Sequence, residues 1–196
     1  MSGAKTKVAV LISGRGSNME ALIHAAEAED YPAEIVVVVS NKPDAVGLVT
    51  ALASGVSAIC VDSKPFGPDR AAHEQAIDAV LRQAGVEVVA LAGYMRVLTP
   101  WFVDAWAGRM INIHPSLLPA YPGLHTHARA IAAGDAEAGC TVHLVTQGVD
   151  EGPILGQARV PILPGDDEDA LAARTLQAEH VLYPKALAEF CRTITI

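Results

Sequence analysis

Residues 111–119 read Ile-Asn-Ile-His-Pro-Ser-Leu-Leu-Pro (INIHPSLLP). The apolar residues up to Ile113 predict a short buried strand, which Pro115 ends because proline has no N–H to donate to a neighbouring strand. Side chains alternate between the two faces of a strand, so Asn112 and His114 are expected on one face, about 7 Å apart. An amide and an imidazole are therefore predicted side by side at the carboxyl end of a strand, where open α/β sheets hold their ligands.

The chain before this stretch alternates between apolar runs and segments with helical periodicity. Nearly continuous apolar strands separated by helices are typical of a doubly wound parallel sheet covered by helices on both faces. The expected strands cover residues 7–12, 34–39, 57–61, 86–91 and 111–114. The expected helices cover residues 17–29, a segment opened by residues 41–44 that ends near residue 55, and residues 69–83 and 99–107.

The pattern changes after Gly123. A helix is predicted from His125 to Ala133, and two extended runs follow at residues 140–146 and 154–162. They are expected to pair antiparallel, because a parallel return needs a crossover of a dozen residues. A long helix over residues 167–190 closes the chain and is expected to be interrupted or bent near Pro184. Linkers and repeats are not evident, so residues 1–196 are predicted to form a single domain.

The composition restricts the classes of partner. A formal charge of −8 argues against a nucleic-acid partner, whose phosphate backbone requires clustered Lys and Arg. The three cysteines are scattered and odd in number, which favours a reducing cytoplasm over a disulfide framework. Apolar runs stay well short of the length that a membrane helix needs, so no membrane partner is expected. A cytoplasmic protein is predicted.

A candidate anion site follows the first predicted strand. Residues 13–18 read Ser-Gly-Arg-Gly-Ser-Asn and lead into a helix, whose free N–H groups and dipole favour a phosphate. The loop lacks the Gly-Lys-Ser/Thr of a nucleotide-binding P-loop, and Met19 stands where a dinucleotide fingerprint has its third glycine. A lone phosphate monoester therefore fits better than NAD. The alternative is a tight turn that merely needs two glycines.

A second polar cluster could approach the histidine. Residues 147–153 read Gln-Gly-Val-Asp-Glu-Gly-Pro and offer the carboxylate of Asp150. Together with Asn112 and His114, it provides the groups needed to stabilise a tetrahedral oxyanion and to move protons. Taken singly, each of these residues is more often structural.

The histidines also raise the possibility of a metal site, since four of them lie in one region of the chain. Zinc-binding motifs such as His-Glu-x-x-His are absent, and partner ligands at metal-binding spacing are lacking, so no catalytic metal is expected. The four are His114, His125, His127 and His143.

Several segments together resemble one enzyme family, the folate-dependent phosphoribosylglycinamide formyltransferases, also called glycinamide ribonucleotide transformylases. The segments occur in the family's order and cover the chain from residue 7 to about 185, and the run INIHPSLLPAYPGLHTH is highly specific. They are residues 10–18, 91–96, 111–127, 139–146, 149–153 and 177–180. The resemblance implies a Rossmann-like formyltransferase fold.

The resemblance also implies a reaction and its site. The amine of glycinamide ribonucleotide would take the formyl group of the cosubstrate 10-formyltetrahydrofolate in purine biosynthesis, without a metal. The chain would act as a monomer or a homodimer. Asn112, His114 and Asp150 would be catalytic, and Asp150 would orient the imidazole of His114 and favour its charged form. The phosphoribosyl group would contact Gly16, Ser17, Asn18 and Glu179. The folate would contact Met95, Arg96, Val97, Leu98 and Asn112.

Other functions share part of the pattern. A 10-formyltetrahydrofolate hydrolase has much of the motif but normally carries an N-terminal regulatory domain, whereas the first strand here is expected at residue 7. Methionyl-tRNA and sugar-nucleotide formyltransferases share the Asn-x-His and Asp set but lack the glycine-rich Ser-Asn loop. A non-catalytic module that binds a phosphoribosyl ligand is a further alternative; it would bind the ligand without folate-dependent turnover.

Overall fold

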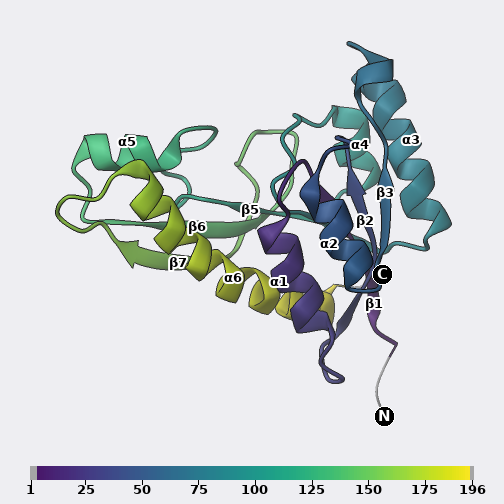
Figure 1. The fold of residues 1–196 in the computed structure, drawn as a ribbon, viewed down its shortest axis with the longest axis horizontal. Helices are drawn as coiled ribbons and strands as arrows, with labels where there is room; N and C mark the ends of the chain where they lie inside the picture. The colour runs from purple at the N-terminus through teal and green to yellow at the C-terminus, as the bar shows by residue number, and fades with distance from the viewer. Residues whose placement is uncertain (1–3, 195–196) are drawn as a thin grey trace.

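The computed structural model describes residues 4–194 and gathers their seven strands in one sheet, in the order β3-β2-β1-β4-β5-β6-β7 (Figure 1). The strands β1 to β5 pair in parallel, whereas β6 pairs antiparallel with β5 and with β7. The predicted doubly wound sheet with an antiparallel extension is confirmed. The strands are β1 (Thr6–Ile12), β2 (Ala33–Ser40), β3 (Ser57–Cys60), β4 (Val88–Leu91), β5 (Met110–His114), β6 (Glu137–Leu144) and β7 (Ile154–Pro161).

Helices fill most of the connections between the strands. They are α1 (Ser17–Ala26), α2 (Val46–Ala53), α3 (Arg70–Gln83), α4 (Pro100–Ala105), α5 (Thr126–Ala133) and α6 (Glu168–Thr193), with a short 3₁₀ turn η1 (Lys64–Phe66). The order of the strands reverses between β1 and β4: the chain runs outward from β1 to β3 and then returns to β4 on the other side of β1. A crevice for ligands forms at the carboxyl ends of two strands where the order reverses in this way.

Each face of the sheet has its own hydrophobic core, because side chains of a strand alternate between the faces. In β1, Val8, Val10 and Ile12 pack in one core with residues of α1 and α6, whereas Ala9 and Leu11 pack in the other with residues of α3 and α4. Figure 1 shows α6 crossing the sheet beside α1. The sheet is therefore fixed from both sides, and its carboxyl edge carries the loops.

The same alternation places the polar residues of β5. Ile111 and Ile113 belong to the core shared with α6, and Met110 belongs to the core shared with α3 and α4. Asn112 and His114 lie two and four residues after Met110 and therefore lie on its face of the strand. The apolar face of β5 thus becomes polar at its carboxyl end, as the alternation predicts.

Of the two outcomes expected near Pro184, the interruption is wrong, because α6 continues from Glu168 to Thr193, and the bend stays a prediction. Proline removes one backbone hydrogen bond from the helix. The neighbouring Tyr183 is fully buried, and its hydroxyl donates to the carbonyl of Leu91 at 2.8 Å. The hydroxyl of Tyr31 donates to the carbonyl of Pro184 itself at 2.7 Å. We infer that tertiary packing keeps the helix continuous.

Other differences concern the ends of elements. The first helix ends at Ala26 instead of residue 29, and the second begins at Val46, two residues after the segment expected to open it. The sixth strand begins at Glu137 instead of residue 140, because its partner β7 pairs with it as far as that residue. Over residues 4–194, the helices are too short or too polar to cross a membrane.

Candidate functional site

A serine connects three loops at the carboxyl edge of the sheet. The Ser13 hydroxyl follows β1 and donates to Oδ1 of Asn41, after β2, at 2.6 Å. The same oxygen accepts from the backbone N–H of Met95, after β4, at 2.8 Å. Ser13 and Asn41 are buried. The loops on both sides of the strand-order reversal are therefore held together before any ligand binds.

Gly16 determines the shape of the predicted phosphate loop. Its φ of 75° lies in the left-handed region that glycine adopts most easily. A Cβ at this position would lie 2.8 Å from Cε of Met19 and 3.1 Å from Cα of Gly47. Among residues 4–194, no side chain forms a capping hydrogen bond at this end of α1. The N–H groups of its first turn, which begins at Ser17, have no intrahelical partner and are suited to an anion.

Asn18 and Glu179 lie 161 residues apart in the chain and meet at this loop. Nδ2 of Asn18 donates to Oε2 of Glu179 at 2.6 Å, and Oδ1 of Asn18 is buried without a hydrogen-bond partner among the described residues. Burial raises the pKa of the Glu179 carboxyl above its usual value, although the hydrogen bond from Asn18 partly offsets this. The structure thus brings the predicted phosphoribosyl residues together.

The predicted catalytic residues meet around one carboxylate. Nδ1 of His114 lies 3.4 Å from Oδ2 of Asp150, and Nε2 of His143 lies 3.6 Å from Oδ1. Nδ2 of Asn112 donates to Nε2 of His143 at 3.3 Å. Asn112, His114 and Asp150 are thus brought together, with His143 as a fourth member of the cluster.

His143 was missed as a member of this cluster. It stands directly opposite Asn112 in the antiparallel pairing of β5 with β6. Its Nδ1 donates to the carbonyl of Leu144 at 2.9 Å, which leaves Nε2 to face Asn112 and Asp150. The sequence predicted the antiparallel pairing but not the register, and the register was the signal that could have identified His143. The described residues hold no group of three or more side chains that could bind a metal ion.

Asp150 lies in a turn that holds its carboxylate toward the histidines. Its φ of 56° is left-handed, a conformation that Asp tolerates better than most residues, and Oδ2 accepts from the N–H of Gly123 at 2.8 Å. Burial raises the pKa of the Asp150 carboxyl. The neighbouring imidazoles of His143 and His114, together with the N–H of Gly123, outweigh this effect and hold the pKa below its usual value. Asp150 is therefore ionised at neutral pH.

The second ring nitrogen of His114 also has a partner. Nε2 donates to the backbone carbonyl of Tyr121 at 2.9 Å, and the side chain is buried. A carbonyl can only accept, so Nε2 carries a hydrogen. Both neighbours of the ring, the Asp150 carboxylate and the Tyr121 carbonyl, are acceptors, and this arrangement suits a doubly protonated imidazolium.

The predicted folate segment, residues 95–98, follows β4 next to the strand that carries Asn112. Met95 and Val97 are exposed apolar side chains, whereas Leu98 packs against the core shared with α3 and α4. The guanidinium of Arg70 donates to the carbonyl of Val97 at 3.2 Å. The segment presents exposed apolar side chains in the loop after the strand that neighbours β5, and Arg96 is half-buried within it.

Gly152 fixes the turn that carries Asp150, and its replacement is a test of stability. A Cβ on Gly152 would overlap the carbonyl oxygen of Leu144, so Gly152→Ala is expected to lower the free energy of unfolding by about 1–3 kcal/mol. The matched control is Gly148→Ala, whose Cβ would meet only the flexible side chain of Glu151. Urea unfolding measures the free energy of unfolding of both variants. Equal values for the two would contradict the role given to Gly152 in the turn.

Comparisons with known proteins identify the family to which the chain belongs. The model of the formyl transferase family matches residues 6–187. A phosphoribosylglycinamide formyltransferase from Escherichia coli is 44% identical over 183 residues, which cover 93% of this chain and 86% of that protein. The trifunctional purine biosynthetic protein adenosine-3 of Drosophila melanogaster is 49% identical over 190 residues, and the match covers 96% of this chain but only 14% of that protein.

Solved structures give the same result. The phosphoribosylglycinamide formyltransferase from Brucella melitensis superposes with a TM-score of 0.92 at 53% identity, and the match covers 98% of both chains. A glycinamide ribonucleotide transformylase from Symbiobacterium toebii superposes with a TM-score of 0.93 at 44% identity, covering 97% of this chain and 89% of that one. Family model, relatives and solved structures agree over nearly the whole chain, and the chain therefore belongs to the formyl transferase family.

Proposed function

We propose that this chain is a phosphoribosylglycinamide formyltransferase, which transfers the formyl group of 10-formyltetrahydrofolate to the amine of glycinamide ribonucleotide. The relatives that carry this name match most of the chain. The observation that carries the proposal is the placement of two sites on one edge of the sheet. One is the anion loop after β1, and the other is the Asn112–His114–Asp150 cluster after β5.

The acceptor substrate fits the first of these sites. Its phosphate would accept hydrogen bonds from the free N–H groups at Gly16, Ser17 and Asn18, at the positive end of the α1 dipole. Its ribose hydroxyls would donate to Glu179, which Asn18 already holds at the loop. The amine at the far end of the ribonucleotide would then point along the sheet edge toward Asn112.

Removing the charge of Glu179 tests the ribose contact. Because the pKa of Glu179 is raised, its carboxylate takes up a proton at a higher pH than an ordinary glutamate does, and the KM for glycinamide ribonucleotide should rise as the pH falls toward that pKa. Glu179→Gln is expected to raise the KM about 10-fold at neutral pH and to lessen its pH dependence. The phosphate of the ligand titrates in the assays of both the wild type and the variant. The contact is therefore tested by the difference between their two curves of KM against pH. Parallel profiles would contradict the contact.

The formyl donor fits the second site. The exposed apolar side chains of Met95 and Val97 offer a surface for the folate ring system, with backbone groups of residues 95–98 available to hold its polar edge. We propose that the reaction needs no metal, because the polarisation of the formyl group can come from Asn112 and His114.

Asn112 and His114 would stabilise the oxyanion that forms as the amine attacks. One N–H of the Asn112 amide is used by His143, and the other remains for the formyl oxygen. The Nε2–H of His114 is held by the Tyr121 carbonyl. A formyl oxygen in its ground state competes with that carbonyl on equal terms, whereas an oxyanion accepts a much stronger, charge-assisted bond. His114 would therefore favour the transition state over the bound substrate, which is the condition for catalysis.

Asp150 would orient His114 and take part in proton movement. The reaction requires one proton to leave the attacking nitrogen and one to reach N10 of the departing folate. The Asp150 carboxylate and the His114 imidazole lie in contact beside the proposed formyl position. Positioned groups of this kind move protons efficiently.

Three further properties belong to the proposal. Residues 1–196 would form a single formyltransferase domain, which the continuous seven-stranded sheet of residues 4–194 supports. The chain would act in the cytoplasm, in keeping with three cysteines that are free in the structure. It would act as a monomer or a homodimer.

Identification of the product tests the proposed function directly. Purified protein incubated with 10-formyltetrahydrofolate and glycinamide ribonucleotide should yield formylglycinamide ribonucleotide, identified by mass spectrometry with the formyl group on the glycinamide amine. A matched reaction with glycinamide lacking the phosphoribosyl group should be far slower, because the anion loop then has no ligand. Formation of free formate without a formylated amine would contradict the proposal.

A further inference from the structure

One short loop segment contacts both members of the His114–Asp150 pair through its backbone. The carbonyl of Tyr121 accepts from Nε2 of His114 at 2.9 Å, and the N–H of Gly123 donates to Oδ2 of Asp150 at 2.8 Å. The direct contact between the two side chains is longer, at 3.4 Å. The shortest restraints on the imidazole and on the carboxylate therefore come from this segment, residues 121–123.

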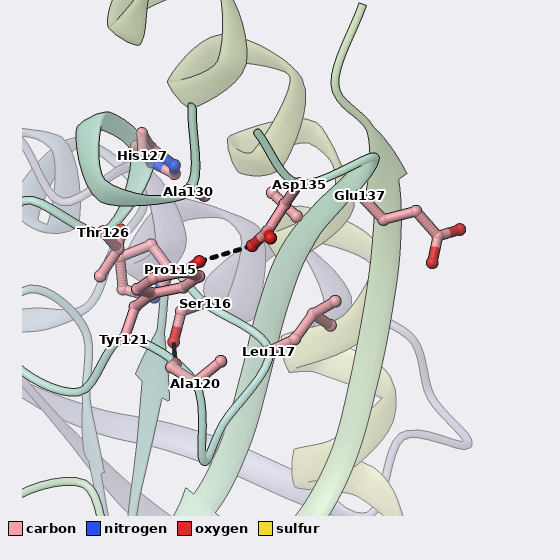
Figure 2. A pocket seen from close by; sticks show the side chains of 11 residues that line it. Pro115, Ser116, Leu117, Ala120, Tyr121, Thr126, His127, Ala130, Asp135 and Glu137 are labelled. Carbon is pink, nitrogen blue, oxygen red and sulfur yellow. Dashed lines mark hydrogen bonds between the residues drawn. The ribbon is translucent and has the colours of Figure 1, made fainter. Parts of the chain in front are cut away.

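Tyr121 holds the segment in a disfavoured backbone conformation. Its φ of 54° lies in the left-handed region, which residues other than Gly, Asn and Asp adopt rarely. Its side chain points toward Asp135, and its hydroxyl donates to Oδ2 of that residue at 2.6 Å (Figure 2). The bond to Asp135 raises the pKa of Tyr121, so the phenol remains a donor at neutral pH. Asp135 follows α5 and provides a fixed point outside the loop.

Arg129 of α5 holds the segment from a third direction. Its guanidinium donates to the carbonyl of Pro122 at 2.7 Å and to that of Leu124 at 3.2 Å. It also lies over the Tyr121 ring, 5.2 Å from the ring centroid, where a cation is attracted to the π system. Asp135 therefore holds the side chain of Tyr121, and Arg129 holds the carbonyls of Pro122 and Leu124.

We propose that Tyr121, Arg129 and Asp135 are positioning residues, which act together as a latch that holds the backbone of residues 121–123 against the His114–Asp150 pair. The effect of the latch is to fix the orientation of the imidazole, whose Nε2–H donates to the Tyr121 carbonyl in the free protein and would be drawn to the oxyanion as charge develops on the formyl oxygen. This inference rests on the function proposed above for its effect on turnover, but its effect on His114 is measurable in the free protein.

The test compares variants that loosen the latch in different ways. Tyr121→Phe removes the hydroxyl bond and keeps the ring, Asp135→Ala removes the acceptor, and Arg129→Gln removes the charge at an exposed position where unfolding is not expected. Each is expected to lower kcat about 10-fold and to change both KM values less than twofold. Asp135→Asn retains an oxygen acceptor for the phenol and should restore most of the kcat.

A second readout does not depend on turnover. In nitrogen-15 NMR spectra of the free wild-type protein, the Nε2–H proton of His114 should be protected from exchange with water, and in the Tyr121→Phe and Arg129→Gln proteins that protection should be lost. Tyr31→Phe is the matched control, because it removes a tyrosine hydroxyl bond of similar length, to Pro184, and should change neither readout.

The outcomes separate the latch from the proposed function. If the wild-type protein showed no ribonucleotide-dependent turnover, the proposed function would be contradicted. The NMR comparison would still test whether residues 121–123 restrain His114. Three results would contradict the proposed latch. They are a wild-type kcat in both Tyr121→Phe and Arg129→Gln, an increased kcat in either variant, and an Nε2–H that stays protected in both.

Discussion

Asn112→Ala and His114→Ala are each expected to lower kcat by about 10²–10³-fold, which is the usual cost of removing one donor from an oxyanion site. The KM values should change far less, because both donors interact most strongly with charge that exists only in the transition state. Steady-state kinetics with each substrate varied in turn provides the measurement. The effects of the two changes should not add fully, since both residues contact the Asp150 and His143 cluster.

His143 supplies an informative comparison for these two variants. It contacts the Asn112 amide but has no free N–H for the formyl oxygen, because its Nδ1 is held by the Leu144 carbonyl. His143→Gln should therefore lower kcat less than Asn112→Ala does. Near-normal turnover in Asn112→Ala or in His114→Ala would remove that residue from the mechanism.

Asp150→Asn is expected to lower kcat by about 10³-fold with little change in either KM, by analogy with carboxylates that orient a catalytic histidine. Asparagine is the suitable replacement because it tolerates the left-handed backbone at this position and keeps an oxygen for the Gly123 N–H. It removes the negative charge that faces His114 and His143 and replaces one acceptor oxygen by an amide NH2 group. The charged form of His114 then loses its nearest counter-ion.

The control for this variant is another carboxylate whose pKa is held low. The hydrogen bond and ion pair from Arg174 lower the pKa of Asp166 to about 2, but Asp166 lies before α6 and takes no part in the proposed cluster. Asp166→Asn should keep the wild-type kcat. A kcat for Asp150→Asn within a few-fold of wild type would show that the charge at this position is dispensable.

The sequence predicted the sheet because the signals involved are local. The apolar runs of β1, β2 and β4 and the alternation along β5 follow from residues adjacent in the chain, and the carboxyl ends of parallel strands meet at one edge. For that reason the sequence alone was sufficient to predict that Asn112 and His114 lie on one face of the strand. The approach of Asp150 to His114 was a hypothesis, which the 3.4 Å contact confirms as geometry.

The missed features depend on contacts between distant residues. The position of His143 opposite Asn112 depends on the register of β5 with β6, which the sequence of neither strand determines alone. The Tyr121 carbonyl reaches His114 only because the loop folds back with a tyrosine in the left-handed region. The continuity of α6 through Pro184 follows from tertiary packing that overrides a local helix breaker.

The measurement that tests the account most directly is a spectrophotometric deformylation assay with 10-formyltetrahydrofolate, run with and without glycinamide ribonucleotide. Loss of the formyl folate only when the ribonucleotide is present would establish the transfer and its acceptor together, and the account predicts this result. Equal loss without the ribonucleotide would indicate a hydrolase. An absence of turnover in both reactions, with the ribonucleotide still bound, would indicate a binding module, and either of these results would contradict the account.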